Sequence, residues 1–484
     1  MPSTPYLPEH DSLDQLLDAA RAYCGQFLAD LPELPTSRPD PQLQPAQLPE
    51  IGIGGLAALA EFDAQFRNLL VGSAGPRYWG FVTGGTTPTS IVGDWLTTVF
   101  DQNPKGLTGP GDLSANIEAQ SLALFRQLLN LPDDFMGGFV TGATMANFTG
   151  LAVARQWAGQ QLGCDVAREG VRPGQIRVLA AVPHSSAIKS LAMLGLGSTS
   201  LENVRSLPDR EAIDITHLTE LLNQQPGQPV IVMASGGTVN TVDFDDLTAL
   251  VALKKQFGFW LHVDAAFGGF VALVPSLAPR LAGWEWADSI AIDNHKWLNV
   301  PYDSAVWLVR SVYAVLQVQT FQNTNAPYLG DPMTNFSYLN MGPENSRRLR
   351  ALPVWLSLIG YGRTGFRVIV ERSVALATEF GQLIAKSGFL QLEAPVRVNV
   401  VCFSLRHHRT DATWLATFQT ALNAEGQVYL TPTVYNGVSC LRAAFVNWRT
   451  QTEDLHRAIR TMTTVYQQLT EAGTDNLRID RHFL

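Results

Sequence analysis

Short apolar runs alternate with longer amphipathic stretches between about residues 78 and 310. Short runs bounded by turn residues are typical of buried strands, whereas helical spacing of apolar residues indicates amphipathic helices. The predicted strands are 138–141, 176–182, 230–234, 260–263, 290–292 and 305–309. The predicted helices are 116–129, 145–161, 186–194, 215–223 and 245–257. This alternation predicts an α/β fold with a mainly parallel sheet, helices on both faces and a ligand site at the carboxyl ends of the strands.

The N-terminal region shows helical periodicity that proline interrupts. Residues 12–29 and 56–70 carry apolar side chains at helical spacing. The connecting segment 31–50 contains six prolines, which favour an extended chain over a helix. Two helices and a strap with little core of their own are expected to pack against another surface.

The alternation ends after Arg310. Residues 311–345 are polar and rich in turn formers, and a loop of this length in a compact enzyme is expected to be functional. Further helices are predicted at 352–359, 367–386 and 453–469, and strands at 398–405, 427–431 and 440–446. The chain is therefore divided into an N-terminal arm (1–77), a large α/β domain (78–350) and a smaller α+β domain (351–484).

The composition is that of a compact protein, because 46% of the residues are hydrophobic and 16% are charged. The net charge of −9, without a cluster of lysines and arginines, argues against a nucleic acid or an anionic membrane as partner. The 4 cysteines are scattered, which favours reduced thiols over a disulfide framework or a zinc site. Residues 1–11 lack the basic end and apolar run of a signal peptide, so we expect a cytoplasmic protein.

A lysine and an aspartate follow two of the predicted strands. Lys296 comes after strand 290–292, and Asp264 ends strand 260–263, 32 residues before the lysine. Burying an ammonium group costs several kcal/mol unless it is paired or neutralised, and the neutral amine is a nucleophile that can form a Schiff base. An acid on a neighbouring strand suits the pyridine nitrogen of pyridoxal phosphate, whose aldehyde the lysine can carry. The pair therefore predicts a pyridoxal phosphate site.

Together with the residues around them, in 259–267 and 294–297, Lys296 and Asp264 resemble the group II pyridoxal-phosphate-dependent amino-acid decarboxylases. This is the family of the aromatic-L-amino-acid and glutamate decarboxylases. The resemblance implies the aminotransferase-like fold (fold type I) and release of carbon dioxide from an L-amino acid through a Lys296 Schiff base. It also implies a homodimer with active sites at the interface, in which the N-terminal arm wraps the partner subunit.

Two further motifs supply predicted cofactor contacts. Residues 137–147 form a strand, a glycine-containing turn and a helix start, which aims backbone N–H groups at an anion. Gly142, Ala143 and Thr144 are therefore the predicted phosphate cradle. By the resemblance, His184 stacks on the pyridine ring and helps to orient the leaving carboxylate.

The same resemblance assigns three more cofactor contacts. Thr238 matches the first threonine of a Gly-Thr-Thr turn beside the cofactor, and Val239 replaces the second. Ala266 would pack on the ring face opposite the stacking histidine. His295 would contact the phosphate.

Substrate contacts are also implied by the resemblance. It places Arg347 near the substrate carboxylates and draws the side-chain pocket from Trp79, Phe81 and the partner subunit's residues 103–107. An aromatic L-amino acid is the favoured substrate, and Lys105 leaves an acidic or other polar one open.

Tyr328 is predicted to decide the reaction type. It lies in the polar segment after Arg310, at the position of the family's catalytic-loop tyrosine. A decarboxylase needs an acid that returns a proton to the α-carbon in a site closed to water. The alternative is a tyrosine packed in an ordinary loop.

Other reactions share this fold, so the fold alone does not fix the chemistry. Trp297 after the His-Lys pair is typical of aromatic amino-acid decarboxylases, whereas lipid-phosphate lyases have a tyrosine there. An aminotransferase remains the alternative because Arg442 falls where many of them hold the substrate carboxylate. A non-catalytic relative is disfavoured, since Lys296, Asp264 and His184 are all intact.

Overall fold

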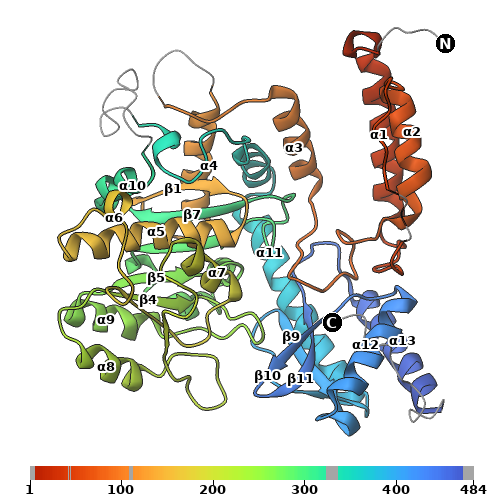
Figure 1. The fold of residues 1–484 in the computed structure, drawn as a ribbon. Coiled ribbons are helices and arrows are strands. Elements are labelled where there is room, and N and C mark those ends of the chain that lie inside the picture. The colour runs from red at the N-terminus through yellow and green to blue at the C-terminus, as the bar shows by residue number, and fades with distance from the viewer. Residues whose placement is uncertain (1–5, 42, 44, 108–112, 323–335, 472–484) are drawn as a thin grey trace.

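The computed structural model describes residues 6–41, 43, 45–107, 113–322 and 336–471. Its centre is a 7-stranded sheet in the order β1-β7-β6-β5-β4-β2-β3 (Figure 1). The strands are β1 (Phe135–Val140), β2 (Arg177–Ala180), β3 (Leu201–Asn203), β4 (Val230–Ser235), β5 (Trp260–Asp264), β6 (Ser289–Asp293) and β7 (Ala305–Arg310). In this sheet only β7 runs antiparallel to its neighbours, so the predicted mainly parallel sheet is confirmed.

Helices separate these strands and bury them. They are α3 (Pro88–Phe100), α4 (Ser114–Leu128), α5 (Ala143–Gln161), α6 (Val166–Glu169), α7 (Ser185–Met193), α8 (Ile215–Gln224), α9 (Leu247–Phe257) and α10 (Ala314–Phe321). The inner strands β2, β4 and β6 have apolar centres and are buried along almost their whole length, as expected for parallel strands covered on both faces. Helix α5 packs along β5, β6 and β7, and its first turn reaches the edge where the predicted site lies.

Two predictions on secondary structure are wrong. The segment 311–345 is not a loop throughout, because α10 forms where Leu316 and Val318 are buried and the Gln317 amide donates to the Met341 carbonyl. Residues 427–430 belong to no strand of a sheet. They lie beside 77–79 instead, where Tyr429 exchanges backbone hydrogen bonds with that segment. The second error arises because an apolar pattern indicates burial and does not identify the segment that provides it.

The C-terminal part is built on a 4-stranded antiparallel sheet in the order β10-β11-β9-β8. Its elements are α11 (Ala351–Lys386), β8 (Leu390–Leu392), β9 (Val400–Leu405), α12 (Ala412–Glu425), β10 (Thr431–Tyr435), β11 (Val438–Ala444) and α13 (Thr452–Glu471). Helix α11 breaks at Gly362, whose φ is 59°, which agrees with the two helices predicted there. The long helix links two cores, because Phe366 packs into the core of the large sheet and Phe380 into that of the small sheet.

The N-terminal arm is a helix pair, α1 (Leu13–Asp30) and α2 (Gly55–Phe66), that extends away from the body of the subunit (Figure 1). Neither helix contains a buried residue, so their apolar faces contribute little to the core of this chain. Within the described ranges, no helix combines the length and apolar character that crossing a bilayer requires.

Candidate active site

The carboxyl ends of β4, β5 and β6 bring most of the predicted site residues to one cavity. In the register of these strands, Ser235 pairs with Asp264 and Asp264 with Ala291, so the strands end at the same edge. The cavity is lined by Val182, Pro183, His184, Ser235, Gly237, Thr238, Val239, Asp264, Ala266, Phe267 and Lys296. The structure therefore gathers five residues that sequence reasoning assigned separately.

Lys296 lies at the base of this cavity and is paired. Its Nζ is 2.8 Å from Oδ2 of Asp293, and the two side chains are only 16% and 3% exposed. The loop at 81–85 packs directly on the lysine backbone, because a Cβ on Gly84 would lie 1.7 Å from the Lys296 carbonyl oxygen. Phe81 and Val82 in this loop have φ values of 54° and 60°. Such backbone strain in bulky residues clusters at functional sites.

Asp264 is held in one orientation by two donors. The Ala266 N–H donates to Oδ1 at 3.1 Å, and the Asn147 amide donates to Oδ2 at 2.9 Å. Donors on both oxygens fix the orientation of the carboxylate. This arrangement fits a protonated pyridine nitrogen, which needs an anion fixed at one edge of the cavity.

His184 stands at the N-cap of α7 beside the same cavity. Its Nδ1 accepts the Ser186 N–H at 3.2 Å and lies 2.7 Å from the Ser186 hydroxyl. Burial lowers the pKa of His184, although the Asp264 carboxylate opposes this shift. A neutral ring with Nδ1 occupied leaves Nε2 for a ligand.

The start of α5 provides an anion site without a protein anion in it. Among the described residues, no side chain caps this helix, so the N–H groups of Ala143 and Thr144 in its first turn lack the usual partner. His295 lies beside this turn, since a Cβ on Gly142 would be 3.4 Å from its Cε1. His295 is 8% exposed, and its Nδ1 accepts the Ser304 N–H. Helix start and imidazole together fit a phosphate group.

Thr238 reaches the cavity on a turn that a buried carboxylate organises. Glu211, which is 6% exposed, accepts the hydroxyls of Thr238 and Thr241 at 2.5 and 2.8 Å. It also accepts the Thr241 N–H at 3.2 Å. Sequence reasoning missed Glu211, because it lies in a connecting segment 27 residues before Thr238. No local pattern distinguishes it from a surface glutamate.

Two predicted substrate residues lie elsewhere. Trp79 is 1% exposed and packs against Phe380 and Phe445 in the core of the small sheet. Arg347 is buried, with Nη2 2.8 Å from Oε2 of Glu118, which is itself fully buried. The charge of Arg347 is thus already neutralised within the chain. The structure does not bring either side chain to the cavity that contains Lys296.

The remaining predicted contacts are Phe81, residues 103–107 and Tyr328. Phe81 is 59% exposed, with its ring 5.9 Å from that of Tyr429. Within 103–107, the Asn103 side chain accepts the Arg347 N–H at 3.1 Å. Tyr328 lies outside the described residues.

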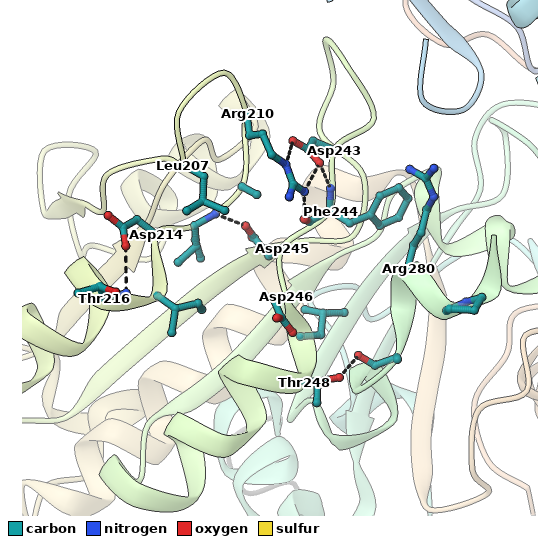
Figure 2. Close-up of a pocket in the computed structure, with 16 residues that line it drawn as sticks. Leu207, Arg210, Asp214, Thr216, Asp243, Phe244, Asp245, Asp246, Thr248 and Arg280 are labelled. Carbon is teal, nitrogen blue, oxygen red and sulfur yellow. Dashed lines mark hydrogen bonds and ion pairs between the residues drawn. The ribbon is translucent and has the colours of Figure 1, made fainter. Parts of the chain in front are cut away.

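A larger cavity of about 420 Å³ lies at the starts of α8 and α9 (Figure 2). Most of its charged groups are already engaged: Arg210 pairs with Asp243 at 2.7 Å, and both oxygens of Asp245 accept backbone N–H groups. Asp214 and Asp246 cap the two helices. None of the predicted catalytic residues lines this cavity, so its size does not make it the active site.

Comparison with known proteins decides the family. The profile described as "Pyridoxal-dependent decarboxylase conserved domain" matches residues 44–406, most of the chain. The chain belongs to this pyridoxal-dependent decarboxylase family. The predicted cofactor and the predicted carboxy-lyase activity are thereby confirmed, and the aminotransferase alternative is not favoured.

Individual relatives in the family are moderately similar. An aromatic-L-amino-acid decarboxylase from Bacillus atrophaeus is 29% identical over 336 residues, covering 68% of this chain and 67% of the relative. Tryptophan decarboxylase 1 from Oryza sativa subsp. japonica is 28% identical over 408 residues, covering 77% and 76%. A phenylacetaldehyde synthase from Petunia hybrida is 25% identical over 400 residues, covering 76% of each.

Solved structures confirm the fold. The crystal structure of Oryza sativa TDC with PLP and tryptamine has a TM-score of 0.84 at 21% identity, covering 97% of this chain and 100% of that one. Mouse CSAD has a TM-score of 0.81 at 19% identity, covering 94% and 99%. The predicted fold type I architecture is therefore correct.

Proposed function

We propose that this decarboxylase converts an aromatic L-amino acid into the corresponding amine and carbon dioxide. The observation that carries the proposal is the convergence of Lys296, Asp264 and His184 on one cavity at the carboxyl ends of β5 and β6. The names of the relatives, which include aromatic-L-amino-acid and tryptophan decarboxylases, support the substrate class.

The proposed roles follow from the positions of the side chains. Pyridoxal phosphate, when bound, withdraws electrons from the bond that releases carbon dioxide. Lys296 would hold its aldehyde carbon through Nζ, and Asp264 would pair with its pyridine nitrogen. His184 would cover one ring face with Nε2 towards the leaving carboxylate. The α5 start and His295 would hold the phosphate, with Thr238 and Ala266 against the ring.

A proton must return to the α-carbon after carbon dioxide has left. A buried acid in a site closed to water directs that proton to carbon. We propose Tyr328 for this role, on the resemblance of its segment to the family's catalytic loop. His184 is the next candidate because it already faces the cavity.

Arg442 on β11 is a better candidate than Arg347 for the substrate carboxylate. Its guanidinium is 8% exposed and donates to the Val239 carbonyl at 3.2 Å, on the turn that lines the cavity. In the described part of the chain, Arg442 makes no ion pair, although the charge of Glu211 acts on it, and its Nε has no partner. A buried cation without a paired anion is costly, and a substrate anion would relieve that cost.

We also propose that the protein is a homodimer in the cytoplasm. Apolar side chains are exposed along the arm and the neighbouring α3, among them Leu13 (67%), Leu17 (52%), Val99 (70%) and Trp95 (45%). Such a surface is typical of a subunit interface. The four cysteines are free, in keeping with a reducing compartment.

The test is a panel of L-amino acids, aromatic, acidic and aliphatic, incubated with the holoenzyme. Carbon dioxide, amine, aldehyde and oxo-acid are measured together. We expect carbon dioxide and amine in equal amounts, with aromatic substrates fastest. Faster turnover of an acidic amino acid would contradict the substrate class, and oxo-acid without carbon dioxide would contradict the reaction.

A further inference from the structure

A chain of hydrogen bonds leads from Asp264 into the interior, away from the cavity. Asn147 Nδ2 lies 2.9 Å from Asp264 Oδ2, and Asn147 Oδ1 lies 2.9 Å from His262 Nε2. His262 Nδ1 lies 2.8 Å from Ser289 Oγ, and Trp260 Nε1 donates to the same oxygen at 2.9 Å. Four bonds therefore connect five side chains from α5, β5 and β6.

Every member behind Asp264 is sealed from water. Asn147, His262 and Ser289 are 0% exposed, and Trp260 is 1% exposed. Trp260, His262 and Asp264 alternate along β5 and so share one face of that strand, and His262 pairs with Ser289 across the ladder to β6. Gly150 of α5 covers the imidazole, because a Cβ there would lie 3.1 Å from the ring. This packing therefore holds the His262 imidazole in one position.

The chemistry of the two ends fixes the direction of every bond. The indole of Trp260 can only donate, so Ser289 Oγ accepts from it. At the other end, the Asp264 carboxylate requires the NH₂ of Asn147. The Asn147 oxygen must then accept from His262, which places the proton of a neutral imidazole on Nε2 and leaves Nδ1 to accept the Ser289 hydroxyl proton. All four protons point towards Asp264.

This direction requires a neutral imidazole. Burial lowers the pKa of His262 to about 4, so the ring is neutral near pH 7. The only described side chain that competes for the Asn147 amide is Ser186, whose Oγ lies 3.4 Å from Nδ2. Without a donor on its oxygen, the amide would lose the contact that prevents it from turning.

We propose that His262 is a positioning residue of the cofactor site, which acts through Asn147 to keep the ionised Asp264 carboxylate aimed at the pyridine nitrogen. This role rests on the proposed function of Asp264. His262 itself touches neither the cavity nor any ligand in it. Its loss should therefore change how Asp264 binds the cofactor and not only how the core packs.

The direct test measures cofactor affinity by equilibrium dialysis of the full-length protein against pyridoxal phosphate. His262→Leu removes the donor, whereas His262→Gln keeps an N–H that can reach Asn147. We expect about tenfold weaker binding for His262→Leu, the loss typical of one hydrogen bond to a charged group. His262→Gln should recover part of this loss. Because His262 acts through Asn147, the variant combining Asn147→Ala with His262→Leu should bind no more weakly than Asn147→Ala alone.

A matched control separates positioning from stability. Leu218 on α8 is fully buried in the same core, so Leu218→Ala should lower the melting temperature without changing cofactor affinity. The proposal is overturned if His262→Leu behaves like Leu218→Ala, or if its effect adds to that of Asn147→Ala. Asp264→Asn serves as the reference. If its cofactor affinity is unchanged, the role assigned to Asp264 is wrong. If Asp264→Asn weakens cofactor binding and His262→Leu does not, only the inference about His262 is refuted.

Nitrogen-15 NMR of histidine-labelled wild-type holoenzyme tests the protonation of the ring directly. We expect one histidine with the proton on Nε2 and no titration at neutral pH, assigned by its loss in His262→Gln. A proton on Nδ1, or a doubly protonated ring at neutral pH, would reverse the bond direction and overturn the proposal.

Discussion

The Nζ of Lys296 is 2.8 Å from a carboxylate oxygen of Asp293, three residues earlier in the chain. An amine attacks an aldehyde carbon only after it has lost a proton, so the nearest base matters as much as the lysine. Asp293 is placed to hold that proton while Nζ reacts. The site therefore contains two carboxylates with different partners: the buried Asp293 faces the lysine, and the partly buried Asp264 is held by Asn147 and Ala266.

Replacing Asp264 by Asn tests the electron-withdrawing role of the site. The amide cannot supply the negative charge that keeps the pyridine nitrogen protonated. We expect a holoenzyme that still binds its cofactor, though less tightly, while kcat falls roughly 10²- to 10³-fold, as when a matched electrostatic contact is removed from a transition state. Carbon dioxide release at saturating cofactor measures this. Wild-type turnover would show that Asp264 is not the partner of the ring.

Arg442 and Arg347 should respond differently to the same substitution. Arg442→Met removes the proposed carboxylate contact and should raise KM about 10- to 100-fold with little change in melting temperature. Arg347→Met leaves Glu118 buried without its partner and should destabilise the fold by about 3 kcal/mol. Steady-state kinetics and urea unfolding of both variants measure these effects. If KM rises only for Arg347→Met, the assignment must be exchanged.

Removing one hydroxyl, in Tyr328→Phe, tests the proton donor. Cofactor binding should not change, since the tyrosine is not assigned to hold the cofactor. Amine formation should collapse, and aldehyde should appear because the carbanion left after carbon dioxide departs is no longer protonated at the α-carbon. Chromatographic analysis of the products measures this, with Tyr466→Phe on α13 as a remote control. Amine at the wild-type rate would transfer the role to His184.

The proposed dimer depends on the N-terminal arm. Deleting residues 1–50 should expose apolar surface and yield a monomer or an aggregate without activity, as judged by analytical ultracentrifugation. Leu17→Gln on α1 should weaken the dimer, whereas Leu48→Gln should not, although Leu48 is 97% exposed against 52% for Leu17. A fully active monomer lacking the arm would contradict the proposal.

His262 should make the fold sensitive to acid. Its pKa in the folded protein is about 4, against an ordinary value of 6.5. Between these two pH values the imidazole is protonated in the unfolded chain and neutral in the folded chain. The unfolding free energy should therefore fall by about 3 kcal/mol as the pH drops from 6.5 to 4, with no further loss from this group below that range. Urea unfolding at a series of pH values measures the slope. His262→Gln should remove this component, and exposed His456→Gln should not.

The sequence alone determined the main chemical elements of this protein. Apolar runs and helical spacing are local properties, so the inner strands and α5, α7, α8 and α9 could be predicted within a few residues. The lysine and the aspartate could be found because parallel strands end at a common edge, which brings Lys296 and Asp264 together without knowledge of any distance.

Only the tertiary structure decided which charges were already paired. Glu118 neutralises Arg347 from 229 residues away in the chain, and Asn147 reaches Asp264 across 117 residues. Trp79 was predicted to line the substrate pocket, whereas the structure buries it in the core of the small sheet. A linear pattern indicates which side chains need a partner, but packing selects the partner, because ion pairs and hydrogen bonds depend on distances that the fold creates.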